Sequence, residues 1–177
     1  MALQRKTPLR AKTGFKPSQG FKRKPPKPRE KEPVERKRRQ GTARSSLTTH
    51  LDIVFSLYIR LRDAMEGGRT RCISCGRVFP FSQMQCGHFF TRHNFSVRWD
   101  EDNCSSQCVE CNCVRSGNIG GYTQGLAAKI GQERLDALTV RAHGTRKWSG
   151  EELRELIKHY ELEIKRLSKE KGISVRI

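Results

Sequence analysis

The sequence predicts an α+β fold: a small zinc-clasped ββα core flanked by several α-helices, with a disordered basic tail at the N-terminus. Three observations lead to this prediction. Four cysteines form two Cys-x-x-Cys pairs, Cys72/Cys75 and Cys108/Cys111, the usual ligand set of a structural zinc. The 32 residues between the pairs are enough for a β-hairpin. Apolar residues recur at helical spacing on both sides of this segment.

Residues 1–44 form the predicted tail. They carry 16 Lys and Arg against 3 acidic residues, in a chain of formal net charge +18, and contain six of the seven prolines. Such a segment cannot bury a core, and its cations favour nucleic acid because they displace counterions condensed on phosphates. The alternatives are a solubilising role or an anionic membrane surface, although no helical apolar stripe accompanies the charge. Phe15 and Phe21 could stack on bases, or they could have no role in binding.

The seven cysteines are an odd number, and the expected compartment decides how they are interpreted. The N-terminus lacks the apolar run of a signal peptide, and no stretch is apolar enough to be a transmembrane helix. We therefore expect a cytoplasmic protein without a membrane partner, in which clustered cysteines bind metal more often than they form disulfides.

The first helix is expected at about residues 49–65, within an N-terminal helical segment of residues 45–68 that a glycine pair ends. Thr49 is the expected N-cap. The opposite face carries Arg60 and Arg62, which are either solvated or in contact with phosphates. The apolar stripe consists of Leu51, Val54, Tyr58, Leu61 and Met65.

Residues 119–177 form a predicted C-terminal helical region. Two short helices, 122–130 and 133–142, precede a long one at 149–171, which opens with a capping box of Ser149 and Glu152. We expect the long helix to pack on the first helix or on a second copy of the chain. Its apolar face consists of Leu153, Leu156, Ile157, Tyr160, Ile164 and Leu167.

Residues 69–118 form the predicted core. All four paired cysteines are expected to share one Zn²⁺, since thiolates bind this ion well and Gly76 suits a tight metal-binding turn. Cys104, four residues before the second pair, could substitute as a ligand. Cys86 and Cys113 are predicted to be small buried hydrophobes or bystanders.

Two short strands and a helix are expected within the core. The strands are predicted at residues 85–90 and 97–99, with an acidic turn at 100–103 and a helix starting near the second cysteine pair. In this ββα geometry, His88 on the first strand faces Asn112 on the helix.

Several short motifs in the middle of the chain carry a family resemblance. They are Ser56-Leu57-Tyr58-Ile59-Arg60-Leu61-Arg62-Asp63, Cys72-Ile73-Ser74-Cys75-Gly76, Gly87-His88, Glu101-Asp102-Asn103, Gln107-Cys108, Cys111-Asn112 and Ser116-Gly117-Asn118. Through them, residues 56–140 resemble the phage recombination family NinG, also called Rap. More broadly, His88, Asn103 and Asn112 among paired cysteines resemble HNH (His-Me finger) nucleases, and their spacing is similar to that of endonuclease VII resolvases.

The resemblance implies a metal-dependent endonuclease acting on branched recombination intermediates, in the bacterial host cytoplasm if a phage encodes the chain. It makes His88 the general base, Asn103 a brace that orients His88, and Asn112 an oxygen ligand of a catalytic Mg²⁺ or Mn²⁺. Because resolving a junction takes two nicks, a homodimer is expected, with the helices at 49–65 and 149–171 as its interface. Other recombination proteins are further expected partners.

Gly87 departs from the endonuclease VII pattern, in which an aspartate metal ligand precedes the histidine. The candidate carboxylates are Asp100, Glu101 and Asp102, but acids are common in such turns. DNA phosphate and water could complete the metal shell instead, or the chain could be inactive.

Three arginines near the proposed site, Arg92, Arg98 and Arg115, are expected either to contact DNA phosphates or to be solvated. His93 is either a second catalytic or ligand residue, or a surface residue. The main alternative function is a non-catalytic, zinc-containing nucleic-acid-binding recombination accessory protein. A dimerisation scaffold is a third. A pure binding module has no need of His88 and Asn112 at these spacings, and a scaffold does not explain the Gly-His pair on a strand.

Overall fold

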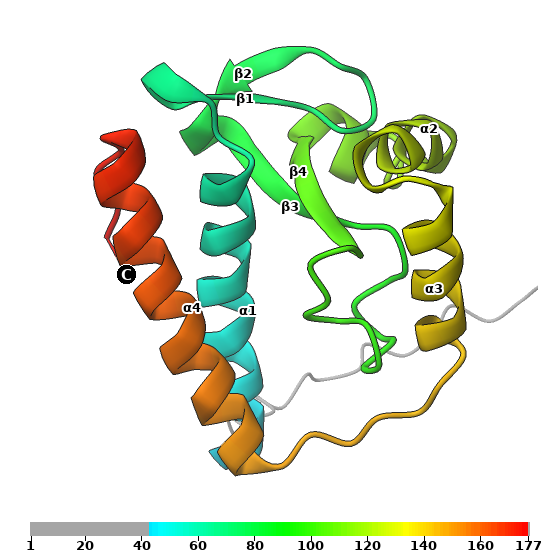
Figure 1. Cartoon of the computed structure of the whole chain (residues 1–177), viewed down its shortest axis with the longest axis vertical. Coiled ribbons are helices and arrows are strands. Elements are labelled where there is room, and N and C mark those ends of the chain that lie inside the picture. Colours follow the sequence, from blue (N-terminus) through cyan, green and yellow to red (C-terminus); the bar gives the residue numbers. More distant parts are fainter. Residues whose placement is uncertain (1–42, 177) are drawn as a thin grey trace, which may run out of the picture. The chain divides into compact units, whose positions relative to one another are not determined.

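The computed structural model describes residues 43–176, so the predicted tail lies outside the described residues except for its last two, as do Phe15 and Phe21. At the centre is an antiparallel hairpin of β3 (Met84–His88) and β4 (Cys104–Cys108). Helix α1 (Ala43–Arg62) lies on one side of the hairpin and helix α2 (Ile119–Ile130) on the other (Figure 1).

The hairpin differs from the predicted one in its second strand. Residues 97–99, predicted as that strand, belong to the loop between β3 and β4. The prediction was wrong because Val97, which is 0% exposed, packs with the apolar side chains of α2 and does not pair with β3. The true second strand reads Cys-Ser-Ser-Gln-Cys, and all five of its residues are buried. Helices cover both of its faces, so no alternation of apolar and polar residues reveals it.

A second, shorter hairpin presents the first cysteine pair. Strands β1 (Arg69–Arg71) and β2 (Val78–Pro80) are antiparallel, and the turn between them holds both cysteines. Gly76 has a φ of 71°, which favours glycine, and its N–H donates to the Cys72 carbonyl at 2.9 Å. The predicted tight turn is confirmed.

Helix α1 begins earlier than predicted. Thr49 is not its N-cap, because the helix starts at Ala43 and the Thr49 hydroxyl donates to the Ser45 carbonyl at 3.0 Å. The helix ends at Arg62, before the glycine pair, which lies in the 3-10 turn η1 (Glu66–Gly68). The predicted apolar stripe is buried apart from its last member, Met65, which is 41% exposed.

The C-terminal helices agree with the prediction to within a few residues. They are α2, α3 (Gln132–Ala142) and α4 (Gly150–Lys171). The capping box is present, since the Ser149 hydroxyl accepts the Glu152 N–H at 3.2 Å and the Glu152 carboxylate accepts the Ser149 N–H at 2.7 Å. None of the helices at residues 43–176 combines the length and apolar character needed to cross a bilayer.

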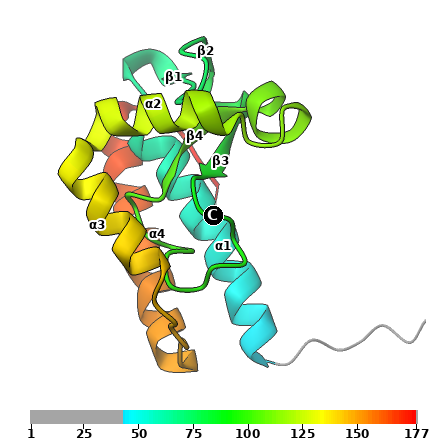
Figure 2. The same ribbon diagram turned by 90° about the vertical axis from the view of Figure 1, so that its right-hand side faces the viewer.

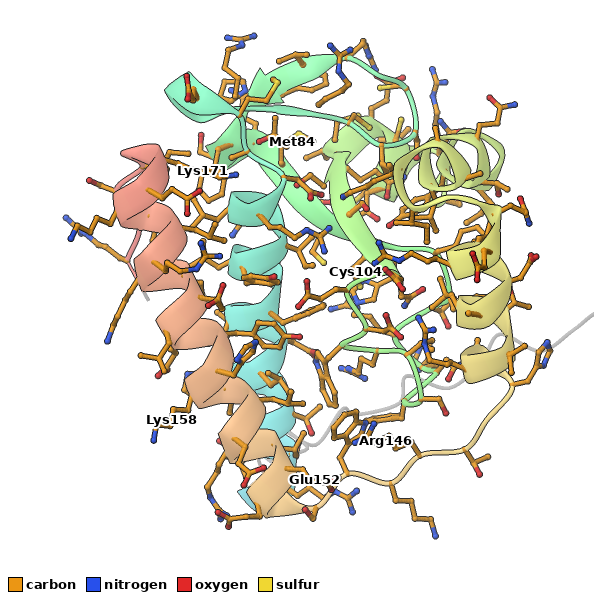
Figure 3. The ribbon with its side chains drawn as sticks, in the orientation of Figure 1. Met84, Cys104, Arg146, Glu152, Lys158 and Lys171 are labelled. Atoms are coloured by element: carbon orange, nitrogen blue, oxygen red, sulfur yellow. The ribbon has the colours of Figure 1, made fainter. Side chains whose placement is uncertain are left out.

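Helix α4 packs along α1 of the same chain (Figure 1). The rings of Phe55 and Tyr160 meet edge to face at 4.9 Å in this interface. At the C-terminal end of α4, the Lys171 ammonium donates to the carbonyls of Leu61, Arg62 and Ala64 (Figure 3). These hydrogen bonds cap the C-terminus of α1. The apolar faces of both helices are thus buried within one chain, and a dimer would have to use other surfaces.

Ion pairs join the acidic turn, residues 100–103, to helix α3. Figure 2 shows α3 and α2 on the side that faces the viewer. Arg141 binds Asp100 at 2.7 Å and Asp102 at 3.0 Å, and Arg134 also binds Asp102. On the other side, the Glu101 carboxylate accepts the Tyr58 hydroxyl of α1 at 2.8 Å. The acidic turn therefore connects helices.

Candidate functional site

The four paired cysteines converge on one point. Cys72 and Cys75 come from the turn after β1, Cys108 ends β4, and Cys111 lies in the π-helical segment η3 (Glu110–Val114). Their sulfurs all lie within 4.8 Å of one another, and those of Cys75 and Cys108 are 3.9 Å apart. A tetrahedral zinc with Zn–S bonds of about 2.3 Å needs sulfurs about 3.8 Å apart. These four cysteines could hold a metal ion such as zinc.

N–H donors surround these sulfurs. Arg77 Nε donates to Cys75 Sγ at 3.5 Å, Asn118 Nδ2 donates to Cys111 Sγ at 3.4 Å, and Cys72 Sγ accepts a backbone N–H of β4 at 3.4 Å. Burial acts to raise the pKa of Cys75, but hydrogen bonds from Arg77 outweigh it and lower the pKa to about 6. Burial instead raises the pKa of Cys72 and of Cys111, so without a cation the surroundings favour the thiolate at Cys75 and disfavour it at these two. A thiophilic cation would supply the positive charge that stabilises the thiolates.

A cavity of about 530 Å³ lies along the unpaired edge of β3. His88 from β3 and Asn112 from η3 both line it, so the structure brings these two predicted site residues together. Arg60 from α1 and Arg92 from the loop after β3 also line it. Two cations at its wall suit an anionic ligand such as a phosphate.

The imidazole of His88 is held neutral. Burial, aided by the charge of Arg92, lowers its pKa to about 4, against an opposing hydrogen bond to the Arg98 backbone. A neutral imidazole has one N–H, which the Arg98 carbonyl accepts, and one nitrogen with a free lone pair. His88 therefore has an unprotonated nitrogen at neutral pH, as a general base or a metal ligand requires.

Asn112 is oriented by a neighbour on β3. Its Nδ2 donates to the Gln85 Oε1 at 2.7 Å, which leaves the amide oxygen of Asn112 as the atom available to a ligand. Cys113, which is exposed, donates to the same Gln85 oxygen at 3.2 Å.

Asn103 is 0% exposed and does not line the cavity. Its Oδ1 accepts the Phe90 N–H at 2.7 Å, and its Nδ2 donates to the carbonyls of Phe90 and Val97 at 3.0 and 2.9 Å. These bonds fix the loop that follows His88. Asn103 thus acts on the position of the loop and not directly on a ligand.

The three predicted DNA-binding arginines are in different surroundings. Arg92 lines the cavity, but Arg98 forms a bidentate ion pair with Asp52 at 3.0 and 2.5 Å, and Arg115 pairs with Glu110 at 2.6 Å. The structure does not bring Arg98 or Arg115 to the cavity.

Arg60 does reach the cavity, with its guanidinium 5.2 Å from the Phe81 ring centroid. The sequence predicts Arg60 and Arg62 to be either solvated or in contact with phosphates, and of the two only Arg60 lines the cavity. Ser56, four residues earlier on the same face of α1, also lines the cavity, but nothing in the sequence marks that face as part of a site.

The cavity has no carboxylate among the described residues that line it. Asp100 and Asp102 bind the arginines of α3, and Glu101 binds Tyr58 and lies 3.7 Å from Arg62. A hard cation such as Mg²⁺ prefers carboxylate oxygens, so these residues alone do not form a complete magnesium site.

Packing explains the glycine before His88. A Cβ on Gly87 would lie 2.3 Å from Gln107 Oε1 and 3.0 Å from Gln107 Cβ. The Gln107 amide is itself fixed, since Nε2 donates to the Ser74 hydroxyl at 2.7 Å and to the Gly117 carbonyl at 2.6 Å. Alternation along β3 also directs position 87 to the face opposite His88. A side chain at this position would displace Gln107.

The remaining candidates are placed as follows. His93 is exposed in the loop after β3 and does not line the cavity. Cys104 is fully buried and does not belong to the four-cysteine cluster. Its sulfur lies within 4.8 Å of the ligand atoms of Cys86 and His88. Cys86 is partly buried and lines the cavity.

Comparison with known proteins gives one family. Residues 4–170 match the family model described as Bacteriophage Lambda NinG protein. Relatives named Protein ninG include those of Escherichia phage 933W, Escherichia phage lambda and Salmonella phage P22, which are 37%, 35% and 34% identical over 97 residues. Each match covers 54% of this chain and 47% of the relative, so the chain spans about half the length of the curated relatives it matches. No solved structure matches the chain.

Cys111→Ser should remove the bound metal and destabilise the fold by several kcal/mol, because metal binding is coupled to folding in such sites. We expect the melting temperature to fall by on the order of 10 °C or more. Metal content by mass spectrometry and thermal unfolding check this. Cys113→Ser, an exposed cysteine outside the cluster, is the matched control. Unchanged zinc content in Cys111→Ser would contradict the assignment.

Gly87→Ala should lower the free energy of unfolding by about 1–3 kcal/mol, the usual cost of overpacking. Gln107→Ala should be destabilising by itself because it removes two hydrogen bonds, but it also removes Oε1 and Cδ, two of the three Gln107 atoms that a Cβ at position 87 would meet, and leaves only Gln107 Cβ at 3.0 Å. The double variant should therefore cost less than the sum of the two single variants. Urea unfolding of all three measures this, and additive costs would show that the two positions are not coupled.

The low pKa of His88 should make stability depend on pH. The folded pKa of about 4 lies below the unfolded value of about 6.5, so the unfolded chain binds more protons between these pH values. The contribution of neutral His88 to the free energy of unfolding is therefore complete above pH 6.5. It decreases by on the order of 2–3 kcal/mol as the pH falls towards 4.

Denaturant unfolding at pH 7.5 to 4.5 measures this dependence, with His88→Gln as the comparison. Since acid also releases thiolate-bound metal from both proteins, the quantity of interest is the difference between them. We expect a shallower pH dependence in His88→Gln, and parallel curves would rule out a low folded pKa at His88.

Proposed function

The chain belongs to the NinG family of bacteriophage lambda, and on that premise we propose that it is a structure-specific DNA endonuclease. Its substrates would be branched recombination intermediates, such as Holliday junctions and D-loops, in which it hydrolyses phosphodiester bonds. The observation that supports this is the meeting of His88 and Asn112 in one cavity whose wall carries Arg60 and Arg92.

The charges of the cavity suit a phosphodiester. Arg60 and Arg92 would hold the non-bridging oxygens and neutralise the charge that develops on the phosphorus centre. The absence of a carboxylate among the described lining residues means that nothing on the wall repels the DNA backbone.

His88 would be the general base. Its unprotonated nitrogen would accept a proton from the attacking water, and the Arg98 carbonyl would hold the ring in the tautomer that this requires. Asn103 contributes indirectly, because its three hydrogen bonds fix the loop that follows His88.

Two kinds of metal ion belong to the proposal. A structural Zn²⁺ at Cys72, Cys75, Cys108 and Cys111 would hold η3 against β4, and so would fix Asn112, the residue after the last cysteine. A divalent ion, Mg²⁺ or Mn²⁺, would supply charge stabilisation for the leaving oxygen. With only the Asn112 amide oxygen from the predicted ligand set at the cavity, DNA phosphate and water would have to provide the other ligands.

Branched DNA is the proposed partner, in the host cytoplasm and with a homodimer as the active form. The apolar faces of α1 and α4, expected as the dimer interface, are buried against each other within one chain. Another surface would therefore join the subunits. Other recombination proteins remain proposed partners.

One observation favours a second function, that of a non-catalytic, zinc-containing nucleic-acid-binding accessory protein. The described lining of the cavity lacks a carboxylate metal ligand, and binding alone would require none. Both functions use the same cationic wall, so only a cleavage assay separates them.

Incubation with a four-way junction, a D-loop and a linear duplex, with Mg²⁺ or Mn²⁺, should give cleavage of the branched substrates. His88→Ala should reduce the rate by about 10²–10⁴-fold, the usual contribution of a general base, while the zinc of the four-cysteine cluster and junction binding stay unchanged. His93→Ala, five residues away and exposed, is the matched control and should cleave like the parent. If the protein binds junctions but does not cleave them with any metal, the endonuclease proposal is wrong and the accessory function is retained.

A further inference from the structure

We propose that Cys86, His88 and Cys104 form a second metal site, selective for thiophilic transition ions such as Zn²⁺ and distinct from the four-cysteine cluster. The three ligand atoms lie within 4.8 Å of one another. None of these residues belongs to the first cluster, and two of them line the cavity.

The register of the hairpin places the three side chains together. Cys86 and His88 are two residues apart on β3 and therefore project from the same face. Cys104 lies directly opposite His88 on β4, so its side chain belongs to that face as well. Figure 3 labels Cys104 at the start of β4.

The two clusters lie at opposite ends of the hairpin. Cys104 is the first residue of β4 and pairs with His88, whereas Cys108 is the last and pairs with Met84. Four residues of extended chain separate them by about 13 Å. One ion cannot bind both, so Cys104 does not substitute as a ligand of the first cluster.

The donor atoms determine the kind of ion. Two thiolates and an imidazole bind zinc and similar transition metals well and hard ions such as Mg²⁺ poorly. In tetrahedral zinc sites such ligand atoms lie about 3.5–3.8 Å from one another. The three atoms here, within 4.8 Å of one another, would need to move together only slightly to bind the ion. Three protein ligands leave a fourth position for water or an anion. Because Cys86 and His88 line the cavity and Cys104 is buried, that position faces the cavity.

The surroundings fit a metal-binding histidine. The His88 ring makes a hydrogen bond to the Arg98 backbone, and a metal-binding histidine usually makes such a bond through its other ring nitrogen. The Cys104 sulfur lies 3.8 Å from the Arg98 carbonyl oxygen, so one loop position contacts two of the three ligands.

If the chain has the proposed endonuclease function, the second metal site would regulate it. Metal at this site would occupy the nitrogen of His88 that the reaction needs as a base. Zinc bound there would block DNA cleavage while leaving the structural site intact, so that cleavage would respond to the concentration of free zinc.

The existence of the site is tested by metal stoichiometry. Protein purified with one zinc is titrated with Zn²⁺ or Co²⁺, and bound metal is counted by native mass spectrometry and by cobalt absorption. We expect two ions on the parent chain and one on Cys86→Ser, Cys104→Ala and His88→Gln.

Cys113→Ser is the matched control, since this cysteine lines the same cavity but lies outside the cluster, and it should bind two ions. One ion on the parent, or two on Cys86→Ser, overturns the proposal. So does a Cys86–Cys104 disulfide found in place of bound metal by mass spectrometry under non-reducing conditions.

The regulatory consequence is measured as the ratio of junction cleavage with and without added Zn²⁺, within each protein. We expect at least tenfold inhibition of the parent and less than twofold inhibition of Cys86→Ser. Equal inhibition of the parent and of Cys86→Ser would show that zinc does not inhibit cleavage through the second site. A protein that never cleaves contradicts the proposed function alone, because the stoichiometry still decides whether the second site exists.

Discussion

Burial of both faces of the β3–β4 hairpin is the constraint on which the rest of the structure depends. A two-stranded sheet is barely stable alone in water, so it needs covering. Helix α1 packs on one face, and Tyr122 of α2 donates to the Gly87 carbonyl at 3.0 Å on the other. Asp63 links these layers, because its carboxylate accepts the Ser106 N–H of β4 at 2.8 Å and binds Lys129 of α2 at 2.7 Å. The four-cysteine cluster then fixes the end of β4.

This packing sets what the cavity can contain. On the face under α2, the Gln107 amide fills the space beside Gly87, so position 87 has no room for a carboxylate. On the face under α1, two cysteines and a histidine meet without an acid among them. The shape of the hairpin therefore accounts both for the missing hard-metal ligand and for the soft donors near His88.

Features encoded by local chemistry could be predicted from the sequence. The paired cysteines, the capping box at Ser149 and the glycine turn at Gly76 each depend on neighbours within a few residues. The position of β4 could not be predicted, because its polar residues are buried by helices distant in the sequence. The same holds for Arg98, whose ion pair with Asp52 spans 46 residues. Long-range partners decided which arginines reach the cavity.

The distribution of acids gives the site its electrostatic character. Asp52, Asp63 and the acidic turn all bind basic side chains that hold the helices in place. The arginines left at the cavity, Arg60 and Arg92, have no carboxylate beside them in its described lining. Such a wall attracts an anion before it attracts a hard cation. If a divalent ion takes part in cleavage, the DNA phosphate would bring most of the negative charge that binds it, so the metal and the substrate would bind together.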